Sequence, residues 1–213
     1  MLKSLHILLT LPLLLLMGLQ GVAPGAALGF DLDVFSQELL SGFHHIVPDG
    51  LDHMAFILGL FFLSRTLPVL LVHATLFTLA HSLMLGLVIL TGLAVPGRWV
   101  EIAVGLTIAA VGLEALFPTK WEGWRPLMIF LFGGIHGLAL AHNLVQAENI
   151  RRSPLAALFG FNLGVECGQL VLIAGLVLVF SRWWQRSWYR ARISLPALGL
   201  ITLTGLHWAW VRW

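Results

Sequence analysis

Long apolar runs, almost free of charge, constrain this chain more than any other feature of its sequence. The run Pro154–Phe180 contains one acidic residue, Glu166, and no basic residue. At ~1.5 Å of rise per helical residue, such a run can cross the ~30 Å hydrocarbon core of a bilayer. Of all residues, 59% are hydrophobic and 10% are charged, whereas a soluble domain carries ~25% charged residues. The sequence therefore predicts an all-α fold, a polytopic membrane helix bundle.

Proline, glycine and arginine residues divide the apolar sequence into about six transmembrane helices. The expected spans are Gly50–Ser64, Pro68–Leu93, Trp99–Phe117, Pro126–Val145, Pro154–Phe180 and Ser194–Val211. Residues 49–213 therefore make up the expected transmembrane domain.

Residues 1–27 have the composition of a secretory signal peptide. Lys3 precedes the apolar stretch Ile7–Met17, and small residues follow it. This pattern predicts cleavage near residues 23–27, and the alternative is a retained first membrane helix. In residues 28–48 apolar side chains recur close to a helical period, so we expect an extracytoplasmic amphipathic helix lying at the outer membrane surface.

The basic residues are divided unevenly between the two sides of the expected bundle. If the first span enters from outside, the inner side carries Arg65, Lys120, Arg125, Arg182, Arg186, Arg190 and Arg192, and the outer side carries Arg98, Arg151, Arg152 and Arg212. Because cytoplasmic loops are enriched in Lys and Arg, this distribution predicts a multi-pass protein of the bacterial inner membrane with its mature N-terminus outside. The basic residues thus indicate orientation and not nucleic-acid binding.

Ionisable side chains inside the expected spans point to a functional site, because such groups are costly at membrane depth unless they are paired or hydrated. They are Asp52, His53, His73, His81, Glu101, Glu114, His136, His142, Glu166 and His207. By helical rise, six of them converge on the outer half of the bundle: Asp52, His53, His81, Glu101, His136 and Glu166. Any one of these could instead form an interhelical hydrogen bond that serves packing. The whole set at one depth favours a function.

Two further patterns surround these residues. Asn162, Glu166 and Gln169 recur at helical spacing and predict a polar stripe that is buried against other helices. Glycines flank both His136 and Glu166, and small residues let helix backbones approach one another. We therefore expect the two helices that carry His136 and Glu166 to cross closely at the site.

The available side chains limit the chemistry of the cluster. Cys167 is the only cysteine, so the chain holds no internal disulfide and no Cys-rich metal site. Imidazoles and carboxylates suit divalent Ni, Co, Zn, Fe or Cu, which makes a transition-metal ion the direct inference. The same groups could instead relay protons, as His and Glu chains do in pumps. The residues alone leave both interpretations open.

Five motifs in this chain, in this order, resemble the HupE/UreJ family of bacterial membrane proteins. They are H-I-V-P-D-G-L-D-H, F-T-L-A-H-S-L-M-L-G, V-E-I-A-V-G-L-T-I-A, F-G-G-I-H-G-L-A-L-A and G-F-N-L-G-V-E-C-G-Q-L. The resemblance implies a helical membrane protein linked to the uptake of nickel, and in some cases cobalt, for hydrogenase and urease. Carried over residue by residue, it implies metal ligation by His45, Asp52, His53, His81, Glu101, His136 and Glu166. Accessory positions would be His44, Asp49, His73, His142 and Asn162.

The first motif departs from the family's usual spacing. His45 and Asp52 enclose one residue more than is common, with Pro48 in the gap. Pro48 and Gly50 should break the backbone between a surface helix that carries His45 and a membrane helix that opens with Asp52 and His53. The sequence therefore favours Asp52 and His53 as ligands and leaves the placement of His45 open.

Two functions compete for this cluster. The first is a membrane permease or metal-binding protein that takes up a divalent transition metal, Ni, Co or Zn, and passes it inward past His73. The chain lacks a G-x-x-x-x-G-K-[ST] motif, so the energy would come from an ion gradient or a partner. The alternative is an intramembrane zinc-dependent hydrolase with Glu101 or Glu166 as the base, although no H-E-x-x-H motif supports it. The expected partners are the lipid bilayer, the metal ion and a metalloenzyme maturation system.

Overall fold

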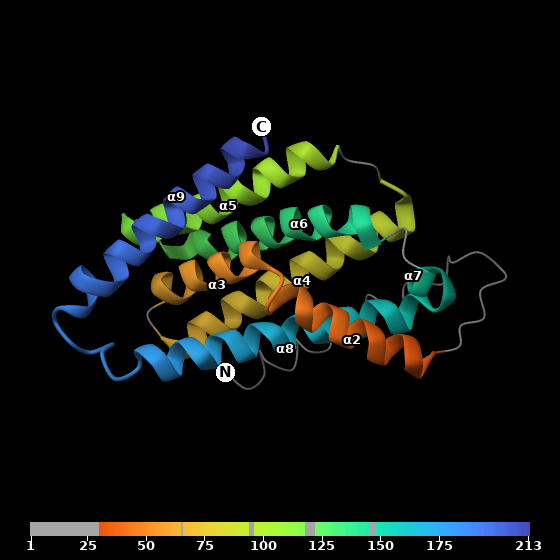
Figure 1. Cartoon of the computed structure of the whole chain (residues 1–213), viewed down its shortest axis with the longest axis horizontal. Coiled ribbons are helices and arrows are strands. Elements are labelled where there is room, and N and C mark those ends of the chain that lie inside the picture. The colour runs from red at the N-terminus through yellow and green to blue at the C-terminus, as the bar shows by residue number, and fades with distance from the viewer. Residues whose placement is uncertain (1–29, 65, 94–95, 118–121, 145–147) are drawn as a thin grey trace.

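The computed structural model describes residues 30–64, 66–93, 96–117, 122–144 and 148–213, and the side chains of residues 122 and 142–144 lie outside this description. All regular elements in these ranges are helical (Figure 1). The α-helices are α2 (Leu32–Ile46), α3 (Leu51–Leu63), α4 (Leu67–Thr91), α5 (Gly97–Leu116), α6 (Arg125–Leu144), α7 (Glu148–Arg152), α8 (Pro154–Phe180) and α9 (Leu195–Val211). A 3-10 turn, η1 (Glu122–Trp124), precedes α6, and a π-helical turn, η2 (Arg190–Ser194), leads into α9. The expected signal peptide lies outside the described residues.

The polytopic membrane bundle is confirmed, but the helices divide differently from the six expected spans. Within the described ranges, α4, α5, α8 and the helix Arg190–Val211 are each long and apolar enough to cross a membrane. Helix α3 has 13 residues and reaches only ~20 Å, so it cannot cross alone. The pair α2–α3 meets the same test when it is taken together, with a bend of 64° between the two helices.

Helix α2 begins with a side-chain cap. The Asp31 carboxylate accepts hydrogen bonds from the backbone N–H groups of Asp33 and Val34, which have no partner inside the helix. The same carboxylate forms an ion pair of 2.7 Å with Arg152 at the end of α7. Asn149 of α7 donates a hydrogen bond of 2.7 Å to Glu38, two turns further along α2. Helix α7 therefore holds the N-terminal part of α2 in place through an ion pair and a hydrogen bond.

The buried face of α2 packs along the first half of α8 (Figure 1). The two helices run in the same direction, because Gly160 of α8 faces Phe35 and Gly168 faces Ile46. At Gly164 a side chain would collide with the backbone of Leu39 and Phe43, so glycine is required there. The expected helix in residues 28–48 is present as α2, and it packs against α8, a helix long and apolar enough to cross a membrane.

The remaining helices pack as pairs around α3. Helix α4 pairs with α6, and α5 pairs with α9. Large side chains from α3 and α4, among them Phe56, Leu60 and Phe77, are almost completely buried at the centre. Large apolar side chains such as Leu178, Leu200 and Trp210 project outward, as expected where lipid replaces water around the protein.

Polar contacts between α4 and α8 confirm the predicted stripe. Ser82 donates to Asn162 at 2.5 Å, Thr75 donates to Glu166 at 3.0 Å, and Gln169 donates to Thr78 at 2.8 Å. Serine and threonine thus satisfy the polar groups of α8 within the bundle. At one end, Glu114 of α5 forms a buried ion pair of 3.0 Å with Arg125 of α6.

Candidate metal centre

Four histidines from four different helices meet near the bend between α2 and α3. They are His45 of α2, His53 of α3, His81 of α4 and His136 of α6. The ring of His53 is central, with centroids 4.6 Å from His45, 5.9 Å from His81 and 4.9 Å from His136. The chain therefore gathers imidazoles that are far apart in sequence into one cluster.

The backbone at the bend sets the positions of the first two histidines. His45 lies in the last turn of α2, and His53 lies in the first turn of α3. Between them, Asp49 donates its N–H to the carbonyl of His44 at 3.1 Å, and Met54 donates to the carbonyl of Gly50 at 2.9 Å. The first bond lies at the end of α2 and the second at the start of α3, with Pro48 between the two helices. The residue by which this motif exceeds the usual family spacing therefore lies in the bend. His45 is consequently directed at His53 although the two belong to different helices.

His81 and His136 are brought together by a close helix contact. At Gly137 of α6 a side chain would meet the backbone of His81 on α4, so only glycine allows this approach. The glycines of α8 face α2 instead. The expectation that the helices carrying His136 and Glu166 cross each other closely is therefore wrong, because each uses its glycines against a different neighbour.

Three of the imidazoles can reach one ion. His45, His53 and His81 each offer a ring nitrogen, and these nitrogens all lie within 4.8 Å of one another. Metal–nitrogen bonds to histidine are ~2.0–2.1 Å long, so two nitrogens that share an ion lie at most ~4.2 Å apart, and small side-chain rotations would bring these three within that distance. Within the described ranges, this is the one group of His, Cys, Asp or Glu side chains with that spacing.

Each histidine of the cluster has at least one ring nitrogen that is buried without a hydrogen-bond partner among the described groups. His53 and His136 are 7% and 1% exposed, and His81 is completely buried. Nε2 of His45, Nε2 of His53 and both ring nitrogens of His81 have no hydrogen-bond partner in the described part of the chain. Buried polar atoms are normally paired, because an unpaired one carries a desolvation cost. Donor atoms left free in this way fit a site that is completed by an ion.

Thr107 fixes the tautomer of the fourth histidine. The Thr107 hydroxyl lies 2.7 Å from the carbonyl of Val104 and 2.9 Å from Nε2 of His136, and when its single proton goes to the carbonyl it accepts from Nε2–H of His136. The other nitrogen, Nδ1, then carries a free lone pair and is buried without a partner in the described chain. His136 is therefore oriented to offer Nδ1 toward the interior, as outer partners orient metal-binding imidazoles elsewhere.

A cavity of about 510 Å³ leads to the cluster, and we call it the imidazole cavity. Its lining includes His45, Asp49, Asp52, His53, Glu101, His136, Trp208 and Arg212. Asp49 and Glu101 are exposed at its rim. The cavity thus has carboxylates at its solvent-exposed rim and imidazoles at its buried end.

Arg212 occupies the mouth of the imidazole cavity. Its guanidinium contacts both oxygens of the Asp52 carboxylate, at 3.0 and 3.3 Å, and lies over the ring of Trp208. It also donates to the backbone carbonyl of Glu101 at 3.3 Å. Asp52 is therefore held by an arginine beside the imidazoles, where the sequence had predicted a direct ligand.

Aromatic rings close the cavity on the inner side of the cluster. Phe56 lies 5.3 Å from His136, centroid to centroid, and Phe77 lies 5.1 Å from the same ring. The two phenylalanines also contact each other at 4.7 Å, and both are buried. In this conformation, apolar side chains separate the imidazoles from the opposite end of the bundle.

The other predicted residues lie apart from the imidazole cluster. Glu166 and Asn162 bond to Thr75 and Ser82 on α4, and Oε2 of Glu166 has no partner among the described groups. His73 is buried with its Nδ1 3.1 Å from the Ser64 hydroxyl. His44 is exposed, and the side chain of His142 lies outside the described part of the chain.

Two residues of this site were not singled out from the sequence. Thr107 is one of several hydroxyls in apolar helices, and only its contact with His136 distinguishes it. Arg212 was counted as a charge that reports orientation. Its position in the last span, near Trp208, was the available signal that it could reach into the bundle.

Comparison with known proteins gives one match. The family profile described as HupE / UreJ protein matches residues 28–212, which is nearly the whole chain. No curated protein and no solved structure matches the chain at a significant level.

Proposed function

This chain belongs to the HupE/UreJ family, and on that premise we propose that it is a membrane permease for a divalent transition metal, nickel or cobalt. The observation that carries the proposal is the trio of His45, His53 and His81. One ring nitrogen from each lies within 4.8 Å of those of the other two, and each of the three rings has a buried nitrogen without a partner among the described groups. His45 and His53 also line the imidazole cavity. Imidazole nitrogen is a preferred ligand of nickel, cobalt and zinc.

We infer that α2 and α3 form one membrane span that is broken at the ion site. The two helices together have the length and apolar character of a span, with a bend of 64° between them. Discontinuous helices are a recurrent way to place ligands near the middle of the membrane in transporters. On this interpretation His45 and His53 face one ion because the span breaks between them.

The charges along the imidazole cavity support a cation as the cargo. Asp49, Asp52 and Glu101 line the cavity together with one arginine, Arg212. The carboxylates attract a divalent ion to the mouth, and the neutral imidazoles replace its water. Arg212 forms an ion pair with Asp52. The Asp52 carboxylate can therefore bind the ion directly only after this pair opens. While the pair is closed, the carboxylate acts on the ion by charge from a distance.

Transport requires a conformational change, because Phe56 and Phe77 block the inward route from the cluster. Phe56 and Phe77 lie between the cluster and His73, the nearest polar group expected on the inward route. The ion therefore leaves inward only after these rings move, which is the behaviour of an alternating-access permease and not of an open channel. We propose that cytoplasmic release past His73 serves metalloenzyme maturation, and that the end carrying Asp31 faces outside.

The zinc-hydrolase alternative gains no support from this site. Among the described residues, the group of side chains with spacing suitable for a metal ion consists of three imidazoles. It includes neither Glu101 nor Glu166, one of which that hydrolase needs close to the metal as a base. Glu166 instead accepts a hydrogen bond from Thr75.

The test is metal uptake by cells that express the full chain, with its membrane abundance measured in parallel. We expect His53→Ala and His81→Ala to abolish nickel or cobalt accumulation. The matched control is His44→Ala, because His44 is exposed beside His45 and outside the cluster. Uptake by His53→Ala and His81→Ala that equals the original chain, at equal abundance, would falsify the proposal.

A second measurement separates a permease from a protein that only binds metal. The purified chain is placed in vesicles that contain a metal-sensitive dye, and nickel is added outside. A permease produces a dye signal that grows with time, whereas a binding protein retains at most a stoichiometric amount of metal. Retention without any internal signal would exclude transport.

A further inference from the structure

A second cavity, of about 560 Å³, lies at the opposite end of α3 from the imidazoles. We call it the hydroxyl cavity. It is lined by Phe61, Phe62, Ser64, Thr66, Leu67, Ser181, Trp184, Gln185, Tyr189, Arg190 and Ser194. These residues come from the end of α3, the start of α4, the segment that follows α8, and η2. The cavity thus lies where the α3–α4 connection meets the α8–α9 connection.

The polar groups of the hydroxyl cavity are mainly hydrogen-bond donors. Its described lining supplies five hydroxyls, one amide and the Arg190 guanidinium, and includes neither carboxylate nor imidazole. A cavity with this set offers nothing that would hold a cation by charge. It suits a ligand with several acceptor oxygens and a negative charge, which is the character of a phosphate group.

One of these donors is buried without a partner. Tyr189 is 6% exposed, and its hydroxyl makes no hydrogen bond of standard geometry within the described part of the chain, although the nearby Ser194 hydroxyl opposes the rise in its pKa. Burial raises the pKa of the Tyr189 phenol, so the hydroxyl keeps its proton and remains a donor at neutral pH. A buried donor that lines a cavity and has no acceptor indicates that a ligand supplies the acceptor.

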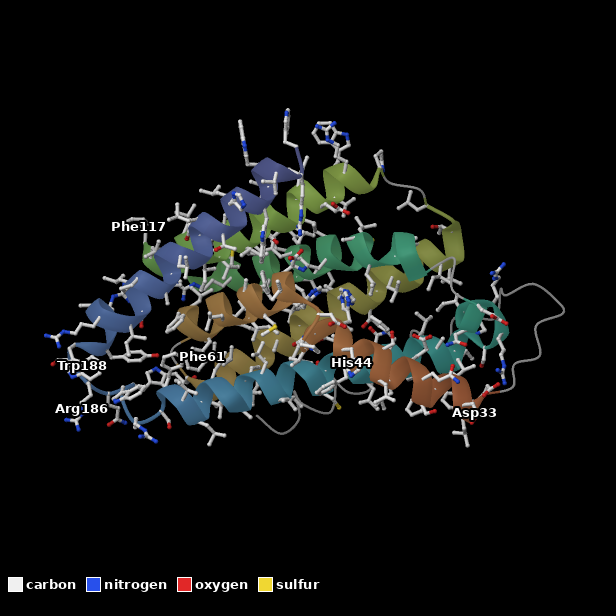
Figure 2. All side chains as sticks on the ribbon, viewed as in Figure 1. Asp33, His44, Phe61, Phe117, Arg186 and Trp188 are labelled. Carbon is white, nitrogen blue, oxygen red and sulfur yellow. The ribbon has the colours of Figure 1, made fainter. Side chains whose placement is uncertain are left out.

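The surroundings of the cavity match the headgroup region of a bilayer. The segment between α8 and α9 carries Arg182, Arg186 and Arg192, all exposed, and Figure 2 shows Arg186 and Trp188 projecting at this end of the molecule. Leu67, which lines the cavity, and Leu195, just beyond it, expose apolar side chains beside these charges. A phosphate with attached acyl chains would find donors in the cavity and apolar surface next to it.

We propose that the hydroxyl cavity binds the phosphate of an anionic phospholipid. In this site Arg190 supplies the positive charge, and the hydroxyls of Tyr189 and its neighbours donate to the phosphate oxygens. Basic pockets between membrane helices bind such headgroups in other proteins. The proposal depends on the chemistry of the cavity and holds whichever side of the membrane it faces, so it stands or falls independently of metal transport.

Lipid retention by the full chain in detergent tests the proposal, with bound lipid counted by native mass spectrometry. We expect phosphatidylglycerol or cardiolipin to be retained about tenfold more strongly than phosphatidylcholine, because the choline cation next to the phosphate of phosphatidylcholine cancels the net charge of that headgroup and is repelled by Arg190. Arg190→Gln should remove this preference. Tyr189→Phe keeps the ring and removes only the hydroxyl, so it should weaken retention by a smaller factor.

The matched control is Arg186→Gln, which removes an exposed arginine of the same segment that does not line the cavity. This variant should retain anionic lipid as the original chain does. Equal losses in Arg186→Gln and Arg190→Gln would overturn the proposal in favour of diffuse attraction. Equal retention of anionic and neutral lipid by the original chain would also overturn it. If millimolar inorganic phosphate displaces the lipid and is itself retained, the lipid assignment fails and the site belongs to free phosphate.

Discussion

The imidazole cavity and the hydroxyl cavity are similar in size and opposite in chemistry. Their volumes are about 510 and 560 Å³, and α3 connects them, with His53 at one end and Ser64 at the other. One is lined by imidazoles and carboxylates, which bind cations, and the other by hydroxyls and an arginine, which bind anions. The apolar part of α3 that follows His53 separates the two sets.

This difference shows that α3 acts mainly as a partition. Nearly all of its side chains beyond Asp52 are apolar, and Phe56, Leu60 and Phe61 are buried between the cavities. An ion bound at one end therefore meets a low-dielectric barrier before it reaches the other. The predictions below weaken or sharpen this separation, beginning with the barrier itself.

Removing the aromatic floor should have the largest effect. Phe56→Ala deletes a fully buried ring that contacts Phe77 and His136, and large-to-small changes of this kind cost about 3–5 kcal/mol. We expect a lower free energy of unfolding in detergent, together with metal leakage through vesicles that contain the variant. The exposed Leu200→Ala is the control for generic loss of apolar surface. A Phe56→Ala protein as stable and as tight as the original would contradict the partition.

Removing one imidazole of the imidazole cavity, that of His45, should lower the affinity for nickel. Loss of an outer partner of a metal ligand already costs up to about a hundredfold in affinity, so His45→Ala should cost more. His44→Ala, one residue away and exposed, should leave affinity unchanged. Calorimetric titration of the purified variants with nickel gives both values. Equal affinities for the two variants would remove His45 from the site.

Opposite changes at the cavity mouth should shift affinity in opposite directions. Asp52→Asn leaves Arg212 without its carboxylate partner beside the site, so nickel affinity should fall about tenfold. Arg212→Gln frees the Asp52 carboxylate, so affinity should rise by a similar factor. The double variant should return close to the original value, because both charges are gone. The same titration measures all three, and changes of one sign in both single variants would contradict the electrostatic account.

Acid should weaken the capping of α2 by Asp31, and this effect should be the smallest of those predicted here. The backbone N–H of Val34, and then that of Asp33 and the Arg152 charge, hold the pKa of Asp31 below its ordinary value, although desolvation opposes them. Its contribution to stability is therefore complete above about pH 4 and is lost as the pH falls through the lowered pKa. Hydrogen exchange at α2 should differ between the original chain and Asp31→Asn at pH 6 and converge near pH 3. A difference that persists at pH 3 would rule out this linkage.

The membrane fold and the family could be predicted because both depend on local pattern. Apolar runs report spans directly, and the ordered motifs lie within single helices or their ends. The polar stripe of Asn162, Glu166 and Gln169 was predicted from helical spacing, and its hydrogen bonds to α4 confirm it. Spacing along one helix identifies a face, and it contains no information on which neighbour covers that face.

The partners of each face therefore could not be predicted. Glycines beside His136 and Glu166 predicted close approach, yet those of α6 meet α4 and those of α8 meet α2. The amphipathic pattern of α2 fits a membrane surface as well as it fits the side of α8, because both present one apolar face. The pairing of Asp52 with Arg212 joins residues at opposite ends of the chain, and no local pattern connects them.

The contact between α2 and α8 also determines when α2 can take up its observed position during synthesis. His45 is translated early, but the backbone of α8 on which its helix rests, around Gly164, follows more than a hundred residues later. At ~5–20 residues per second, the ribosome needs roughly 10 s to cover that interval. Until then the buried face of α2 lacks the helix against which it packs, and the backbone bonds of the bend hold His45 near His53 without that support. The observed arrangement of α2 therefore depends on a chain that has been synthesised through α8.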